Sequence, residues 1–223
     1  NTYSNGQNVG IFGQRYASDG TRIGDEFLVG TESGKVLKLG DGSFLHTWRE
    51  GAENNINVSS VNIKGRLLDP NFVAQGTSFT IDDQATTAQD QIDGISHTST
   101  ADGGALILWH RSDASGGVDI FARRISPSGA LQGDTFKVNS TTTGSQRHPT
   151  ATALKDGGFV ITWTALAQGF DSDTGDALAN REVYGRRYAA DGTVVGNEFR
   201  ISTSAGHSDD SQFSRPSVTA LDD

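Results

Sequence analysis

The acidic stretch Asp171-Ser-Asp-Thr-Gly-Asp176 is the part of this sequence whose residue types and spacing best suit metal chemistry. Carboxylates placed around a glycine supply the oxygen ligands of Ca²⁺, which takes about six to eight of them. The stretch departs from an EF-hand loop, because its third acidic position is shifted and no Glu stands at the twelfth place. We predict a calcium site at Asp171, Asp173 and Asp176, with an ordinary solvated turn as the alternative.

A recurring arginine is the second candidate for chemistry. Arg15, Arg66, Arg124 and Arg187 stand in similar phrases, of which Tyr-Gly-Arg-Arg-Tyr-Ala-Ala-Asp-Gly around Arg187 is typical, and the copy around Arg66 reads as one residue longer. A guanidinium offers a planar fork to a carboxylate or sulfate group of a glycan. The ligand-binding hypothesis names Arg15, Arg124 and Arg187, together with Phe170 as a sugar-stacking side chain. Repetition favours the alternative, in which each Arg pairs between strands and lays its stem over apolar surface.

Catalytic patterns are missing from the sequence. It contains no His-Glu-x-x-His, no Gly-x-Ser-x-Gly and no phosphate-binding Gly-x-x-x-x-Gly-Lys. Asp and Glu are plentiful, but no two of them stand at positions that mark them as the paired catalytic carboxylates of a glycosidase. The leading hypothesis is therefore a non-enzymatic binding or adhesion module, possible ligands being glycans or other cell-surface groups. A carbohydrate-binding lectin and a polysaccharide-active enzyme are the alternatives.

Composition narrows the classes of partner. The 223 residues carry a net charge of -9, which argues against nucleic acid because phosphate binding needs a basic footprint. No apolar run reaches the length of a membrane span. The absence of Cys excludes disulfides and thiolate metal sites, and the absence of Met predicts a processed or excised segment. The oligomeric state is left open.

Two repeated phrases indicate which elements position these residues. Asp41-Gly, Asp102-Gly and Asp156-Gly each lead into a β-rich run that ends in Trp48, Trp109 or Trp163, and the arginine phrase follows as a second hairpin around another tight turn. Four short antiparallel strands per unit are typical of a β-propeller blade. We predict one all-β repeat domain over 1–223, a propeller of about four blades, with an open β-repeat solenoid as the alternative. The units span roughly 1–32, 33–82, 95–139 and 146–202, with 213–223 as a closing or next-unit strand.

The combination of Pro-Ser-Val-Thr-Ala-Leu, Asp-Gly-Gly-Phe-Val-Ile-Thr-Trp and Gly-Asn-Glu-Phe-Arg-Ile resembles repeats in large secreted bacterial proteins of the RTX type. The resemblance covers most of 1–29 and 95–223 and is weaker over 33–82. It implies export or a cell-surface location, a multidomain context, and calcium binding or adhesion. It implies no catalytic residues. The Gly-Gly-x-Gly-x-Asp nonapeptide of the RTX β-roll is absent, so calcium binding of that kind does not follow.

Overall fold

The structure is a computed structural model, which describes residues 2–4, 7–32, 34–50, 62–82, 94–112, 117–142, 144–170, 177–202 and 215–221. Within these, only the backbone is described for 2–4, 7–9, 112, 167–170 and 177–181. Every regular element in this part of the chain is a β-strand, so the all-β prediction is confirmed. None of the described residues forms a helix long and apolar enough to cross a membrane.

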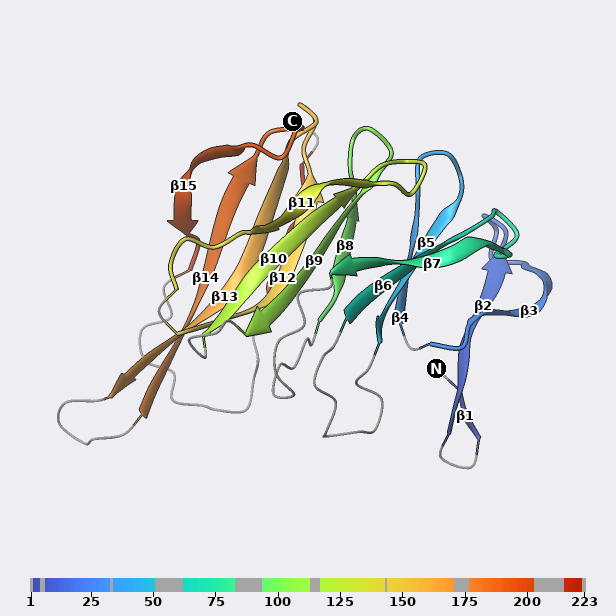
Figure 1. Ribbon diagram of the computed structural model, residues 1–223, viewed down its shortest axis with the longest axis horizontal. Helices are drawn as coiled ribbons and strands as arrows, with labels where there is room; N and C mark the ends of the chain where they lie inside the picture. The colour runs from blue at the N-terminus through green and yellow to red at the C-terminus, as the bar shows by residue number, and fades with distance from the viewer. Residues whose placement is uncertain are drawn as a thin grey trace.

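The strands fall into four consecutive groups, which we call units 1 to 4 (Figure 1). Unit 1 contains β1 (Thr2–Ser4), β2 (Gln7–Tyr16) and β3 (Arg22–Gly30). Unit 2 contains β4 (Gly34–Lys38), β5 (Phe44–Glu50), β6 (Asn62–Leu68) and β7 (Ala74–Asp82). Unit 3 contains β8 (Ser96–Ser99), β9 (Ala105–Ser112), β10 (Val118–Ile125) and β11 (Leu131–Lys137). Unit 4 contains β12 (Ser145–Ala153), β13 (Phe159–Phe170), β14 (Ala177–Tyr188) and β15 (Val194–Arg200).

Each unit is an antiparallel meander in which neighbouring strands in the chain are neighbours in the sheet. One parallel bridge, Val118 to Ser145, joins units 3 and 4 into a single eight-stranded sheet. The units follow one another as a fan, with unit 1 at one end and β15 at the other (Figure 1). The described sheets do not close into a ring.

The hydrophobic core lies between units rather than within them. One buried cluster joins units 2 and 3, and a second joins units 3 and 4. Successive side chains of β9 point to opposite faces, so Ile107 and Trp109 enter the first cluster while Leu106 and Leu108 enter the second. Trp163 is also fully buried, in the second cluster, and Trp48 is 4% exposed, so the repeated Trp residues pack in the core.

The register of the strands corrects the repeat alignment around Arg66. A small residue faces a Phe in the last two strands of every unit, in the pairs Gly13–Phe27, Gly65–Phe79, Ala122–Phe136 and Gly185–Phe199. Counted from these pairs, Arg66 corresponds to Arg123 and Arg186, and Leu67 takes the place of Arg124 and Arg187. The expected extra residue is not there.

The reason for the wrong alignment is the turn that follows. In the turn after β6, the N–H of Phe72 donates to the carbonyl of Asp69, as Gly129 N–H donates to Ser126 in unit 3. Phe72 has a φ of 65°, a left-handed conformation that glycine adopts in the other units. The glycine that marks this turn in the other units is missing from unit 2. An alignment of the repeats by sequence is therefore one residue out of register there.

Residues 215–221 lie beside unit 4 without forming a regular strand. The N–H of Ala220 donates to Thr152 Oγ1 of β12 over 3.3 Å. The segment therefore lies beside the first strand of unit 4.

Candidate functional site

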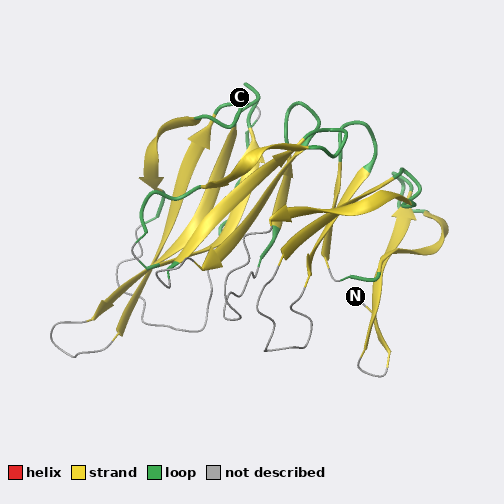
Figure 2. Cartoon of the chain, in the orientation of Figure 1, coloured by secondary structure: helices red, strands yellow, loops and turns green. Residues whose placement is uncertain are grey.

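Tight turns gather at one end of the units and form what we call the turn rim, the turns 17–21, 39–43, 69–73, 100–104, 126–130, 154–158 and 189–193 (Figure 2). In the turn before β9, Gly104 N–H donates to the Asp102 side chain over 3.1 Å, and Gly103 has a φ of 84°. Gly158 N–H donates to Asp156 in the same way over 3.0 Å. An Asp that accepts from the backbone two residues on, followed by a glycine free to take a left-handed φ, explains why Asp-Gly specifies these turns.

Neighbouring turns touch one another along the rim. The N–H of Gly40 in unit 2 donates to the carbonyl of Gly103 in unit 3 over 2.7 Å. A Cβ on Gly40 would lie 2.6 Å from the Gly103 Cα, so only glycine permits this approach. The rim is thus one continuous surface across units 2 and 3.

The structure places two of the predicted arginines on this rim, each against an Asp of its own unit. Arg124 Nη2 lies 3.4 Å from Asp102 Oδ2, and Arg187 forms an ion pair with Asp156. About half of each side chain in the second pair is exposed, at 47% for Arg187 and 53% for Asp156. These partners match the pairing alternative drawn from the sequence. They also leave carboxylate and guanidinium groups open to solvent.

A third charge comes from the next unit. The turn around Asp191 and Gly192 packs on Arg124, whose Cδ lies 3.5 Å from the position of a Cβ on Gly192. A backbone hydrogen bond from Thr193 is the main cause that lowers the pKa of Asp191, and the charge of Arg124 adds to it. Arg124 therefore lies between Asp102 of its own unit and Asp191 of the following unit.

Hydrogen bonds keep the rim carboxylates ionised. The Thr100 hydroxyl is the largest influence lowering the pKa of Asp102, followed by Gly104 N–H and then Arg124. For Asp156 the Gly158 N–H comes first and Arg187 second. At neutral pH the rim thus carries fixed negative and positive groups side by side.

Arg15, the third arginine of the ligand-binding hypothesis, is placed differently. Its guanidinium carbon lies 5.5 Å from the centre of the Phe27 ring, in a cation–π arrangement on the surface of unit 1. No ion pair to Arg15 occurs among the described residues, because unit 1 contributes no described turn equivalent to 100–104 or 154–158. Arg15 precedes the rim turn 17–21, as Arg124 and Arg187 precede their own turns, but it lacks the Asp partner that they have among the described residues.

The side chains of the other predicted site residues lie outside the described part of the chain. Asp171, Asp173 and Asp176 lie outside the described residues, and of Phe170 only the backbone at the end of β13 is described. Within the described part of the chain, no three acidic or His side chains gather as they would around a metal ion. The calcium site at 171–176 therefore stays a prediction.

Sequence reasoning missed a second set of arginines, which joins the units. Arg123 Nη1 donates to the carbonyl of Ile81 in unit 2 over 2.8 Å, and Arg186 Nη1 donates to the carbonyl of Val138 in unit 3 over 2.9 Å. Ile81 and Val138 hold equivalent positions, two residues after the repeat Phe. The Arg-Arg dipeptide at 123–124 and 186–187 was the available signal, since neighbouring residues on a strand point to opposite faces.

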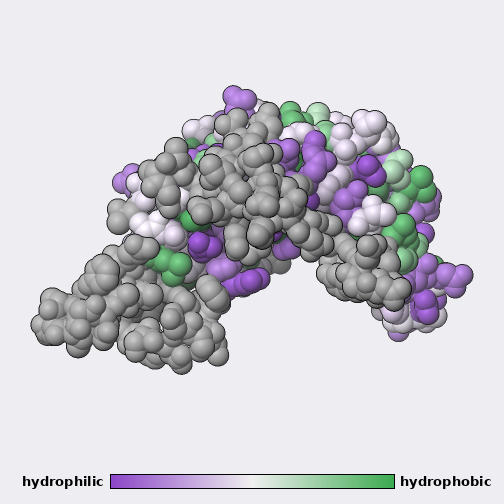
Figure 3. All heavy atoms as spheres, turned by 60° about the horizontal axis from the view of Figure 1, so that its bottom comes forward, coloured by the Kyte–Doolittle hydropathy of each residue, from purple (hydrophilic) through white to green (hydrophobic). Residues whose placement is uncertain are grey.

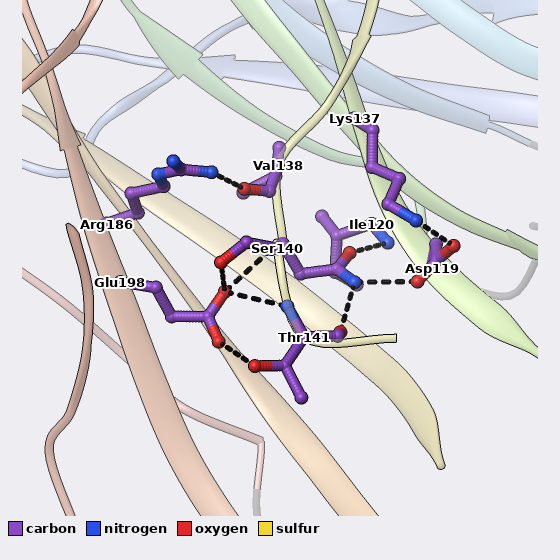
Figure 4. A network of polar contacts seen from close by, with 9 residues as sticks. Asp119, Ile120, Lys137, Val138, Ser140, Thr141, Arg186 and Glu198 are labelled. Carbon is purple, nitrogen blue, oxygen red and sulfur yellow. Dashed lines mark hydrogen bonds and ion pairs between the residues drawn. The ribbon is translucent and has the colours of Figure 1, made fainter. Parts of the chain in front are cut away.

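Glu198 contributes to the same joint through the segment that follows β11 (Figure 4). Its carboxylate accepts hydrogen bonds from Ser140 N–H at 2.8 Å and from Thr141 Oγ1 at 2.6 Å. Burial works to raise the pKa of Glu198, but the hydrogen bonds from Thr141 and Ser140 outweigh it and lower the pKa. Nearby, buried Asp119 accepts from Lys137 Nζ and Asn139 Nδ2, which fixes the start of the segment.

A histidine site lies between β5 and β8. Thr47 Oγ1 and His97 Nε2 are 2.6 Å apart, and burial lowers the pKa of His97 to about 3, with further contributions from Lys35 and His46. His46 is 2% exposed, and burial lowers its pKa as well. Both rings are therefore neutral at physiological pH.

Comparisons with known proteins give distant structural likenesses. No protein-family model and no curated protein matches the chain. Among solved structures, it is similar to a candidate exo-β-1,3-galactanase from Bifidobacterium bifidum s17, with a TM-score of 0.45 and 14% identity over 83% of this chain and 57% of that chain. It is also similar to a fucose lectin from Kordia zhangzhouensis in complex with methyl-fucoside, with a TM-score of 0.40 and 12% identity over 76% of this chain and 98% of that chain. The chain thus spans 57% of the length of the first of these structures.

Proposed function

We propose that this chain is a non-enzymatic carbohydrate-binding module that uses the turn rim. The observation that carries the proposal is the exposed pair of Asp156 and Arg187, repeated one unit earlier as Asp102 and Arg124. Neighbouring hydroxyl groups of a sugar both donate and accept hydrogen bonds. A carboxylate beside a guanidinium offers one acceptor group and a planar fork of donors side by side.

The repetition of the pair favours a polymeric or clustered ligand. Two similar weak sites on one rigid surface bind a repeating glycan more tightly than either site alone, because the second contact is intramolecular. An acidic glycan would use the guanidinium of Arg187, and a neutral glycan would use both members of the pair. Adhesion to a glycan-coated surface is the activity that such a module would support.

Screening on a glycan array that includes acidic and neutral sugars tests this function. We expect binding by the native chain and at least a several-fold weaker signal from Arg187→Ala and Asp156→Ala. Both side chains are half exposed, so neither substitution disturbs the core. Arg200→Ala is the matched control, since Arg200 is 48% exposed and paired with Glu182 away from the rim. Silence of the native chain on all sugars, or equal loss with the control, would overturn the proposal.

We further infer that the four units are blades of a β-propeller and that the chain is a repeat module of an exported, RTX-like bacterial protein. The meander of four strands in units 2 to 4, with packing between successive sheets, supports the blade interpretation. The sequence resemblance supports the exported context. Calcium at Asp171, Asp173 and Asp176 belongs to the same proposal.

The calcium part has its own test. Chelated protein should melt at a higher temperature when millimolar calcium is added, and the triple change of Asp171, Asp173 and Asp176 to Asn should abolish that rise. Magnesium at the same concentration is the control ion. An unchanged melting temperature in calcium would remove this part and leave the carbohydrate proposal standing.

A further inference from the structure

Two joints inside the chain, between units 2 and 3 and between units 3 and 4, follow one rule. In unit 3, Phe121 and Ile125 pack into the cluster shared with unit 2, and in unit 4 the equivalent Tyr184 and Tyr188 pack into the cluster shared with unit 3. We call the side of a unit that faces the preceding unit its leading face. The leading faces of units 3 and 4 thus each use an apolar pair from the third strand of the unit, whereas unit 2 has Lys64 and Leu68 at these positions.

Unit 1 carries the same pair on a leading face that nothing described covers. Phe12 and Tyr16 occupy the positions of Tyr184 and Tyr188, and they are 39% and 63% exposed, whereas Tyr188 is fully buried. Leu28, opposite Phe12 in the sheet, is 47% exposed. Figure 3 shows apolar surface at the end of the molecule that β2 and β3 form in Figure 1.

At the opposite end of the fan, unit 4 exposes apolar side chains whose equivalents are buried in units 2 and 3. Ile81 of unit 2 and Val138 of unit 3 are completely buried against the next unit. Ile201 holds the same position in unit 4 and is 53% exposed, and Phe199 beside it is 46% exposed. We call this surface, formed by Arg187, Phe199 and Ile201, the trailing face of unit 4.

The polar groups of the two faces also match. Inside the chain, Arg124 lies between Asp102 of its own unit and Asp191 of the next. At the trailing face, Arg187 already pairs with Asp156, and the residue equivalent to Asp191 is Asp19 on the leading face of unit 1.

Two further leading-face contacts have equivalents on unit 1, whereas Gln14 stands at the position of Arg123 and Arg186. Glu26 corresponds to Glu198, whose carboxylate holds residues 140 and 141 of the preceding unit. The turn glycine Gly20 corresponds to Gly192. A Cβ on Gly20 would meet nothing within 4 Å, whereas a Cβ on Gly192 would meet Arg124 of the preceding unit.

We propose that the leading face of unit 1 docks on the trailing face of unit 4 in a second copy of this chain. The new joint repeats the two joints within the chain, with Tyr16 and Phe12 against Ile201, and Asp19 beside Arg187. The two faces lie at opposite ends of the fan, which is why a second copy rather than the same chain supplies the partner (Figure 1). Such a head-to-tail contact is heterologous, so it builds either a closed ring of copies or an extending chain.

Sedimentation velocity over about a hundredfold range of protein concentration tests the contact, because the assembly follows mass action. We expect the native chain to exceed twice its monomer mass of 23.6 kDa at the upper end of the range. Tyr16→Asp and Ile201→Asp should each shift the association to at least tenfold higher concentration. Val73→Asp is the control, since Val73 is 62% exposed and lies on neither face, and it should associate as the native chain does.

Mixing the two variants distinguishes head-to-tail docking from any symmetric contact. The Tyr16→Asp chain keeps an intact trailing face and the Ile201→Asp chain keeps an intact leading face, so an equimolar mixture should form a dimer with one of each. Circular dichroism spectra of both variants should match that of the native chain, which checks that they are folded. A native chain that stays monomeric throughout, or a mixture that stays monomeric while the native chain associates, would overturn the proposal.

Discussion

Glu198 of β15 accepts a 2.6 Å hydrogen bond from the hydroxyl of Thr141, which belongs to the preceding unit. The same carboxylate accepts from the Ser140 N–H and hydroxyl. A side chain at the outer edge of one unit thus anchors the segment that leads out of the unit before it. This contact makes the joint between units 3 and 4 polar at its edge and apolar at its centre.

Removing that carboxylate should loosen the joint. We expect Glu198→Ala to lower the free energy of unfolding by about 1–2 kcal/mol, because the hydrogen-bond donors of residues 140 and 141 lose a charged acceptor. Urea denaturation of dilute protein measures the change. Glu26→Ala is the matched control, since Glu26 holds the equivalent position on unit 1, where no described residues bind its carboxylate, and its effect should stay within about 0.5 kcal/mol. Equal losses in the two variants would contradict this role.

The aromatic residue in the left-handed turn of unit 2 sets two effects against each other. Phe72 stacks on Phe44 with ring centres 4.2 Å apart and makes a tilted contact with Phe27 at 4.4 Å, while its φ of 65° costs about 1–2 kcal/mol. Two aromatic pairs contribute about 0.5–1.5 kcal/mol each, in addition to the buried apolar area. We therefore expect Phe72→Gly to destabilise the protein by about 1 kcal/mol in chemical denaturation. A gain in stability would mean that backbone strain outweighs the stacking.

The glycine that faces the repeat Phe is expected to tolerate one methyl group and no more. A Cβ at Gly65 would lie 2.9 Å from Phe79 Cζ and 3.0 Å from Ile81 Cδ1. Ala122 occupies the same position opposite Phe136 in unit 3, so Gly65→Ala should be nearly neutral. Gly65→Val should cost about 1–3 kcal/mol through overpacking. Thermal melts of the two variants side by side check the difference, and equal melting temperatures would refute it.

His97 should make stability fall as the solution becomes acidic. The folded state holds the pKa of His97 at about 3, whereas an unfolded His binds its proton near pH 6.5. Between these values the unfolded state binds more protons, so the free energy of unfolding decreases as pH falls through this window. The slope reaches about 1.4 kcal/mol per pH unit for one such group.

Urea midpoints at about pH 7.5 and about pH 5 measure this slope, because the carboxylates of the rim titrate only below that range. His97→Gln keeps a partner for Thr47 and removes the titration, so the difference between the two midpoints should shrink. Part of the slope should remain, since burial lowers the pKa of His46 too. An unchanged difference in His97→Gln would show that His97 is not the group responsible.

Local patterns in the sequence predicted the strands and turns well, because those depend on neighbouring residues. Asp-Gly and alternating apolar residues, as in Phe159, Ile161 and Trp163, specify a turn and a face whatever lies beyond them. The position of Arg66 was mistaken because Phe72 replaced a turn glycine. The joints were not predicted, since Arg186 and Glu198 act through contacts with residues about 50 to 60 positions away. Which side of a unit a polar residue reaches depends on the packing of two sheets.

The placement of the core between units has a consequence during synthesis. The face of β9 that carries Ile107 and Trp109 completes the cluster begun by β5 to β7. Leu106 and Leu108 on its other face stay uncovered until β13, with Trp163, has been made. A chain growing from the ribosome therefore closes one cluster while opening the next, and it always carries one uncovered apolar sheet near its growing end. Each newly made unit therefore covers the apolar face that the unit before it leaves exposed.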